Sequence, residues 1–194
     1  MVERMKTSPV RGGAHLDDPV LDQLLSEPVV VLMVGPAGAG KSTVARELAA
    51  RRPHLAIVSY DQEQGDGQVV GEAAVARAHT RLDRHLADGA GAVVDGTHRQ
   101  SARRAAVRRI AATHRLPTVA VVVLPGLDQC LHRQTLRTRV VAEHRVRAHH
   151  AAVTALLPVL PGEGYDLVAV LALAASGLPD FRENAAAVRD PLKS

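Results

Sequence analysis

The chain alternates between short apolar runs and longer amphipathic segments along its 194 residues. The apolar runs consist mostly of Val, Leu and Ala and are too short for buried helices, so they predict buried β-strands. The predicted strands are Val29–Val34, His54–Ser59, Ala92–Val94, Thr118–Leu124 and Asp166–Leu171.

The segments between these strands repeat apolar residues at helical spacing. In residues 72–88, for example, Ala76, His79, Leu82 and Leu86 recur at helical spacing, and Gly89 and Gly91 follow as a stop signal. The predicted helices are Lys41–Arg51, 72–88, Ser101–His114, 128 to about 137, and a last helix through Leu157 that ends near Pro158 and Pro161. Apolar strands that alternate with helices imply an α/β fold with a parallel five-stranded sheet covered on both faces. On such a sheet, ligands bind beyond the carboxyl ends of the strands.

The two ends of the chain lack this pattern. Residues 1–27 mix prolines and glycines with charges, which predicts a flexible arm with one short helix over Pro19–Leu25. Residues 28–173 form one predicted domain, in which the charged stretch 137–150 is expected to be a small helical lid. Residues 174–194 are expected to form a C-terminal tail.

A glycine-rich segment follows the first strand and opens the first helix. It fits the phosphate-binding pattern G-x-x-x-x-G-K-[ST], also called Walker A, at every fixed position and in the strand–loop–helix context that the pattern requires. Glycines let backbone N–H groups converge on phosphate oxygens, and the helix N-terminus adds its positive dipole end. The predicted phosphate-binding residues are Gly35, Ala37, Gly38, Ala39, Gly40, Lys41, Ser42 and Thr43. We therefore expect the chain to bind a nucleoside triphosphate, with Lys41 on the β- and γ-phosphates and Ser42 on Mg²⁺.

Composition narrows the function classes only slightly. Hydrophobic residues make up 46% of the chain but aromatic residues only 2%, which disfavours a single-strand binding surface built on base stacking. The formal net charge is +4, and nearly all of the positive charge is arginine. Such basicity can attract polyanions, but a GC-rich coding sequence explains it equally well.

The cysteine content and hydropathy favour a cytoplasmic location. The single cysteine, Cys130, cannot form an internal disulfide, and it is most simply a small buried residue. No apolar run reaches transmembrane length and no signal peptide is recognisable, so we expect no membrane association. No protein partner can be inferred. The ten histidines lack zinc-ligand spacing, and His144, His149 and His150 are predicted to lie on a solvated helix.

Two aspartates follow predicted strands at the edge where a ligand would lie. Asp61 comes two residues after Ser59, and a carboxylate there can accept a proton from an attacking hydroxyl. Asp95 ends the next strand in a Walker-B-like position that can hold Mg²⁺. Each could instead be a turn or helix-capping aspartate.

Three arginines, Arg133, Arg137 and Arg139, follow the fourth predicted strand. Guanidinium groups on a closing lid can stabilise the charge of a transferring phosphoryl group. In so arginine-rich a chain, a solvated surface is the competing interpretation.

The chain from Val29 to about Leu171 resembles the P-loop kinase family that includes the kinase module of bacterial polynucleotide 5′-kinases, within the adenylate-kinase-like group. The resemblance rests on four segments besides the phosphate loop. They are Ser59 with Asp61, Asp95-Gly96-Thr97-His98, Cys130 with Arg133, and Glu163-Gly164-Tyr165.

The resemblance implies transfer of the γ-phosphoryl group of ATP or GTP to an acceptor hydroxyl. It implies Asp61 as the base, Lys41 and Arg139 as transition-state stabilisers, and Arg133 as a further nucleotide-binding residue. It also implies Mg²⁺ on Ser42, with Asp95 beside it.

Two departures from the family pattern affect the acceptor. Gln64 stands where polynucleotide kinases of this type carry an arginine for a substrate phosphate, and His98 stands where the family has Asn. The acceptor therefore stays open between a nucleic-acid end, a nucleoside and a small metabolite. A nucleotide-binding regulatory or interaction protein with weak ATPase activity is the alternative from another class.

Overall fold

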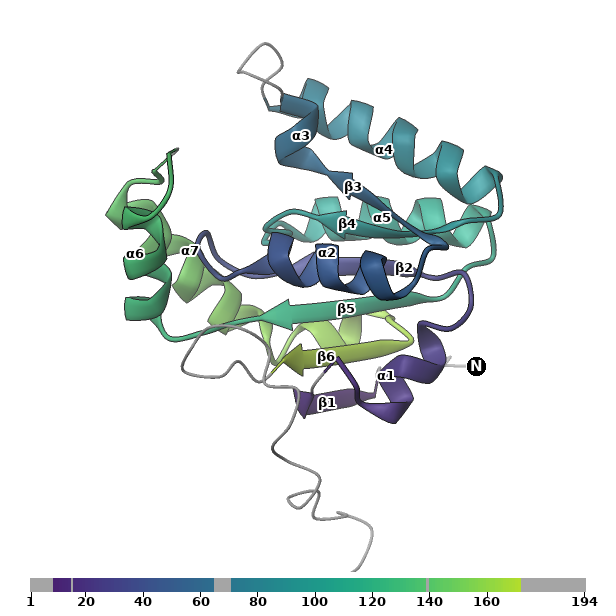
Figure 1. Ribbon diagram of the computed structural model, residues 1–194, viewed down its shortest axis with the longest axis horizontal. Coiled ribbons are helices and arrows are strands. Elements are labelled where there is room, and N and C mark those ends of the chain that lie inside the picture. Colours follow the sequence, from purple (N-terminus) through teal and green to yellow (C-terminus); the bar gives the residue numbers. More distant parts are fainter. Residues whose placement is uncertain (1–8, 15, 65–70, 139, 172–194) are drawn as a thin grey trace, which may run out of the picture.

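A parallel sheet of six strands forms the centre of the molecule, in the order β1-β6-β5-β2-β4-β3 (Figure 1). The computed structural model describes residues 9–14, 16–64, 71–138 and 140–171. The strands are β1 (Val10–Ala14), β2 (Val30–Val34), β3 (Leu55–Ser59), β4 (Gly91–Asp95), β5 (Thr118–Val123) and β6 (Leu167–Leu171). The helices are α1 (Pro19–Leu24), α2 (Lys41–Arg51), α3 (Tyr60–Gln64), α4 (Glu72–Ala87), α5 (Ser101–Thr113), α6 (Leu127–Thr135) and α7 (Glu143–Leu156), with the 3₁₀ turn η1 (Leu160–Glu163).

Alternate residues of the central strand β2 pack into two separate hydrophobic cores, one on each face of the sheet. Val31 and Met33 face a layer formed with α1 and α2, whereas Val30, Leu32 and Val34 face a layer formed with α4, α5 and α7. All five residues of β2 are buried, as expected for a strand covered on both faces. The parallel α/β architecture predicted from the sequence is confirmed.

The predicted number of strands was wrong by one. Val10–Ala14, assigned from the sequence to a flexible arm, pairs in parallel with β6 at the edge of the sheet. The strand escapes a pattern-based prediction because it contains Gly12 and Gly13, is largely exposed, and pairs with the last strand of the chain.

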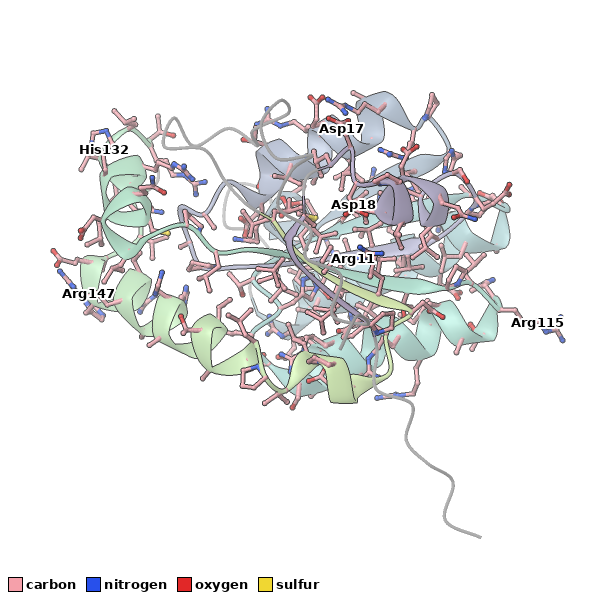
Figure 2. The ribbon with its side chains drawn as sticks, turned by 90° about the horizontal axis from the view of Figure 1, so that it is seen from below. Arg11, Asp17, Asp18, Arg115, His132 and Arg147 are labelled. Carbon is pink, nitrogen blue, oxygen red and sulfur yellow. The ribbon has the colours of Figure 1, made fainter. Side chains whose placement is uncertain are left out.

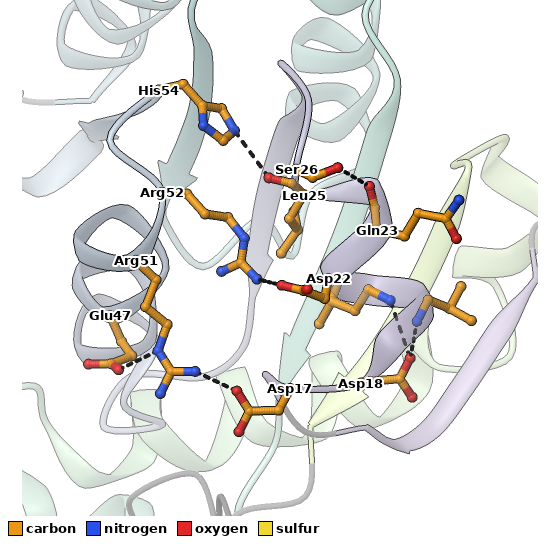
Figure 3. A network of polar contacts seen from close by, with 12 residues as sticks. Asp17, Asp18, Asp22, Gln23, Leu25, Ser26, Glu47, Arg51, Arg52 and His54 are labelled. Atoms are coloured by element: carbon orange, nitrogen blue, oxygen red, sulfur yellow. Dashed lines mark hydrogen bonds and ion pairs between the residues drawn. The ribbon is translucent and has the colours of Figure 1, made fainter.

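The helix predicted near Pro19 is present as α1, and polar contacts hold it against the C-terminal end of α2 (Figure 3). The Asp18 carboxylate caps it by accepting from the amides of Val20 and Leu21 at 3.0 and 3.2 Å. Arg51 pairs with Asp17 at 2.5 Å, and Arg52 pairs with Asp22. Residues 16–25 therefore pack on the domain rather than extending from it.

Helix α6 and the start of α7 lie beyond the carboxyl ends of the strands (Figure 1). A small cluster of Ala37, Cys130 and Val146 joins the phosphate loop, α6 and α7. Helix α7 ends at Leu156, one residue from the predicted helix end at Leu157, and its Val153 packs in the sheet core. Cys130 is buried, as predicted.

Many charged side chains project outward and take no part in this core. Arg115 and Arg147, for example, extend from opposite ends of the molecule (Figure 2). In the described part of the chain, no helix is both long enough and apolar enough to cross a bilayer.

Candidate active site

The phosphate loop joins β2 to α2 and is held by close packing of its glycines. Gly38 and Gly40 have φ angles of 82° and 98°, which favour glycine. A Cβ on Gly35 would lie 2.4 Å from the Val123 carbonyl oxygen, and one on Gly38 would lie 2.4 Å from that of Cys130. The loop is therefore fixed between the end of β5 and helix α6, and only glycine fits at these two positions.

The Lys41 ammonium group is buried under this loop. Its Nζ donates a hydrogen bond of 2.8 Å to the Pro36 carbonyl oxygen. Burial lowers the pKa of Lys41 to about 8, although the carboxylates of Asp95 and Asp61 oppose the shift. The structure thus brings the three predicted residues Lys41, Asp61 and Asp95 into one electrostatic environment.

The two aspartates reach this place from adjacent strands. Asp95 is the last residue of β4, is buried, and lies opposite Ser59 in the parallel register. Asp61 follows in the first turn of α3 and is exposed. The two carboxylates therefore suit different tasks. The buried Asp95 can support a cation, and the exposed Asp61 can contact an acceptor.

Ser42 and Thr43 occupy the first turn of α2 and are exposed. A hydroxyl and a carboxylate are oxygen ligands of the kind that Mg²⁺ takes, alone or through water. The Ser42 hydroxyl at the helix N-terminus and the Asp95 carboxylate near Lys41 therefore fit a magnesium ion bound with phosphates. Among the described residues, no group of three His, Cys, Asp or Glu side chains could form a separate metal centre.

Arg133 contacts the phosphate loop itself. Its Nη1 donates to the carbonyl oxygens of Ala39 at 2.8 Å and Gly38 at 3.3 Å. The neighbouring Gln134 is buried, and its Oε1 accepts from the Val141 amide at 3.1 Å. Helix α6 thus supports the loop through a charged side chain. The predicted contact between Arg133 and the nucleotide stays a prediction.

Arg139 lies outside the described residues, so its predicted place on the lid stays a prediction. Arg137, two residues earlier, is close enough to Lys41 for its charge to lower the lysine pKa. The side chain of Gln64 is also outside the described part of the structure.

Two half-buried histidines on α7 were missed by the sequence analysis. His149 is half-buried, and its pKa is lowered by burial and then by the charges of Arg99, Lys41 and Arg145. His150 is half-buried as well, and its Nε2 lies 3.0 Å from the Pro125 carbonyl oxygen. The expectation of a solvated helix agrees with the exposed His144, whereas His149 and His150 are partly buried. The signal available in the sequence was the four-residue spacing of Arg145 and His149, which places them on one helical face.

Some of the arginines that follow β3 and β4 are buried, and others are exposed on the surface. Arg104 is buried and paired with Glu163, and Arg103 pairs with Glu72 at 3.2 Å. Arg77, Arg81 and Arg84 are exposed on α4 and line a cavity of about 540 Å³. This cavity reaches α3 at Glu63, which pairs with Arg81 at 3.2 Å.

The parallel sheet and the phosphate loop with its buried lysine define a P-loop protein of the α/β class. The sequence profile described as AAA domain matches residues 30–160, which is more than half of the chain. The chain belongs to this family of P-loop kinase-like domains. In a comparison with curated protein sequences, none matches significantly.

Solved structures with the same fold include several kinases. The Pnkp1/Rnl/Hen1 RNA repair complex contains a chain with 14% identity and a TM-score of 0.56. The match covers 66% of this chain but only 45% of that one. A putative kinase from Chloroflexus aurantiacus has 16% identity and a TM-score of 0.55, over 75% of this chain and 85% of the other. A gluconokinase from Sinorhizobium meliloti has 16% identity and a TM-score of 0.52, over 78% and 87%. At these identities the likeness shows the fold alone, which is that of a P-loop kinase.

Proposed function

We propose that the protein transfers the γ-phosphoryl group of ATP or GTP to an acceptor hydroxyl. The observation that carries this proposal is the position of Asp61 and Asp95 at the carboxyl ends of the paired strands β3 and β4, where the charges of both act on the buried Lys41 of the phosphate loop. A buried ammonium group near pKa 8 can attract phosphate oxygens, and an exposed carboxylate nearby can serve a reacting hydroxyl.

In the proposed reaction, the Asp61 carboxylate accepts the proton of the acceptor hydroxyl. The hydroxyl oxygen forms a bond to the γ-phosphorus, while the bond from that phosphorus to the β–γ bridging oxygen breaks and releases the nucleoside diphosphate. Lys41 and Arg139 stabilise the negative charge on the transferring group. Magnesium, held through Ser42 with Asp95 beside it, would neutralise charge on the β- and γ-phosphates.

A 5′-hydroxyl of a polynucleotide or nucleoside is the first acceptor that we propose. Gln64 cannot make the charge-assisted bond that an arginine makes to a phosphate. The exposed arginines of α4, which line the cavity next to α3, offer that charge from another element. Their position next to α3, the helix that carries Asp61, suits phosphates that follow the reacting nucleotide in a strand.

Labelled phosphate transfer tests the proposal directly. The full chain is incubated with Mg²⁺ and γ-labelled ATP or GTP, together with 5′-hydroxyl oligonucleotides, nucleosides, sugars or sugar acids. We expect label on a 5′-hydroxyl acceptor, loss of transfer in Asp61→Asn with ATP binding retained, and loss of binding in Lys41→Met. Asp128→Asn, an exposed aspartate on α6, is the matched control and should transfer as the wild type does.

Other outcomes of the same screen separate the alternatives. Label on a sugar or sugar acid alone would identify a small-metabolite kinase. Tight nucleotide binding with no labelled acceptor would favour a regulatory nucleotide-binding protein. Transfer that persists in Asp61→Asn would remove Asp61 from its role as base. A cytoplasmic location accords with the buried free cysteine and stays part of the proposal.

A further inference from the structure

The strand that leads into the phosphate loop loses its neighbour on one side just before the loop. β2 pairs with β5 as far as Val34, but its pairing with β4 ends at Leu32. Two groups from the segment after β4 complete this side. Nδ1 of His98 lies 2.8 Å from the Met33 carbonyl oxygen, and the Gly35 amide donates to the Thr97 carbonyl oxygen at 3.4 Å. The Thr97–His98 segment therefore continues the sheet up to the first residue of the phosphate loop.

His98 adopts a backbone conformation that needs support from its surroundings. Its φ of 43° is uncommon for a residue with a side chain, and such conformations persist where neighbouring contacts fix them. The ring is buried and packs against Tyr60, with 5.0 Å between the ring centroids. Because a carbonyl oxygen can only accept, Nδ1 carries the proton in its bond to Met33.

Arg104 supplies the support for this backbone. Its Nη1 donates to the His98 carbonyl oxygen at 2.8 Å. Its Nε and Nη2 donate to the two carboxylate oxygens of Glu163, with 2.9 Å between Nε and Oε2. Arg104 is only 1% exposed, so water does not replace these bonds easily. Glu163 in turn belongs to η1, 59 residues further along the chain.

The planar guanidinium group of Arg104 matters because it bonds the His98 carbonyl and the Glu163 carboxylate at the same time. A guanidinium group has five N–H donors in one plane, whereas a lysine ammonium is a compact charge on a flexible stem. Lysine could keep the ion pair with Glu163, but it could not hold both carboxylate oxygens and the His98 carbonyl in this geometry.

We infer that Arg104 is a positioning residue of the phosphate-binding loop, anchored by Glu163 and acting through the Thr97–His98 segment. The hydrogen bonds of Arg104 described above go to His98 and Glu163 rather than to the loop. Arg104 holds the carbonyl of His98, and the His98 segment holds Met33 and Gly35. This inference rests on the proposed nucleotide binding.

Substitution of Arg104 by lysine tests the inference, with Arg108→Lys as the matched control. Arg108 also approaches Glu163, at 3.8 Å from Nη2 to Oε2, but instead of contacting His98 its guanidinium lies over the ring of Tyr165. For the full chain, titration calorimetry with MgATP gives the dissociation constant, and thermal unfolding gives the stability of each variant. We expect Arg104→Lys to remain folded and to bind MgATP at least about tenfold more weakly. Arg108→Lys should bind as the wild type does.

Amide hydrogen exchange gives a second readout that does not depend on ligand. In Arg104→Lys, the Gly35 amide should exchange at least about tenfold faster than in the wild type, while the Val31 amide in the middle of β2 keeps its rate. If Arg104 had only a general structural role, the substitution would accelerate exchange of the Gly35 and Val31 amides equally and would leave the affinity for MgATP unchanged. That result would overturn the inference.

Two further results keep the inference testable. If Arg104→Lys does not fold, Glu163→Gln replaces it, because this change removes the charged anchor that holds the Arg104 guanidinium against the His98 carbonyl oxygen. Unchanged Gly35 exchange and MgATP affinity in that variant would overturn the inference. If the wild type binds no MgATP, the proposed function fails. Comparison of the exchange rates of the Gly35 and Val31 amides then still decides whether Arg104 positions the loop.

Discussion

The guanidinium group of Arg133 donates to the carbonyl oxygen of Ala39 at 2.8 Å. In a planar trans peptide, this carbonyl and the N–H of Gly40 point in opposite directions. Arg133 on α6 therefore turns the Gly40 amide toward the side away from α6. An arginine that the sequence suggests for nucleotide contact thus also orients the backbone that would bind phosphate.

Substitution of Arg133 should weaken nucleotide binding through this orientation. In Arg133→Met the peptide between Ala39 and Gly40 loses its charged partner, worth about 1.5–3 kcal/mol for a hydrogen bond to a charged group. We expect the dissociation constant for MgATP, measured by calorimetry, to rise about tenfold or more. Arg147→Met, which removes an exposed arginine from α7, is the control and should bind normally. Equal affinities in the two variants would contradict this account of Arg133.

Gly38→Ala should disrupt the loop itself. The new Cβ would lie 2.4 Å from the Cys130 carbonyl oxygen, and φ at this position is 82°. A left-handed conformation alone costs an alanine about 1–2 kcal/mol, and the overlap adds to it. We expect the free energy of unfolding, from urea titration, to fall by at least about 2 kcal/mol, together with loss of MgATP binding.

Gly126→Ala is the matched control for that change. Gly126 precedes α6, has a φ of −55°, and has open space around the position of a Cβ. Its replacement should alter the free energy of unfolding by no more than about 0.5 kcal/mol. A similar loss in both variants would show that helix α6, rather than the loop, is sensitive to substitution.

The lowered pKa of Lys41 predicts how nucleotide binding depends on pH. The ammonium form attracts phosphate, and burial lowers the pKa to about 8 in the free protein. Affinity for MgATP should therefore be constant below pH 8 and should fall above it, approaching about tenfold per pH unit. Calorimetry between pH 7 and 9.5 measures this, and Lys41→Arg should remove the dependence because arginine stays charged.

Asp95 provides a second check on the same titration. Its charge raises the pKa of Lys41 and partly offsets burial. In Asp95→Asn the affinity should begin to fall at a lower pH than in the wild type. An unshifted profile would mean that Asp95 does not act on Lys41 in solution.

His98 predicts a loss of stability in mild acid. Burial lowers its pKa to about 4 from the ordinary value of 6.5. Between these values the unfolded chain binds the proton and the folded protein does not, so stability falls as the pH drops from 6.5 toward 4. The full effect is on the order of 3 kcal/mol. Urea unfolding at pH 7 and pH 4.5 should show a larger loss for the wild type than for His98→Asn, whose amide can still donate to Met33. Equal losses would exclude His98 as the group that titrates.

Sequence patterns predict most of this fold because its strands and helices are locally encoded. The buried strands are continuous apolar runs, and α2 begins at Lys41 and ends at Arg51 as predicted. The missing strand, β1, has no such local signal. Its place depends on pairing with β6, which lies more than 150 residues later in the chain.

The candidate site likewise has one part that the sequence predicts and another that it does not. The phosphate loop is contiguous, so its glycines and Lys41 are recognisable from spacing alone. The supports of that loop are distant in sequence: Arg133 bonds a carbonyl 94 residues earlier, and Arg104 pairs with a carboxylate 59 residues later. No periodicity links such residues, and only the folded chain brings them together.

The pairing of β1 with β6 has a practical consequence for shortened versions of this chain. Starting at residue 28, the boundary suggested by hydrophobic patterning, would remove β1 and α1 and uncover one side of β6 with its free N–H and C=O groups. An uncovered strand of this kind recruits strands from other molecules. Proteins shortened at residue 28 would thus be prone to self-association. The N-terminal segment with β1 and α1 prevents this by covering the edge of β6.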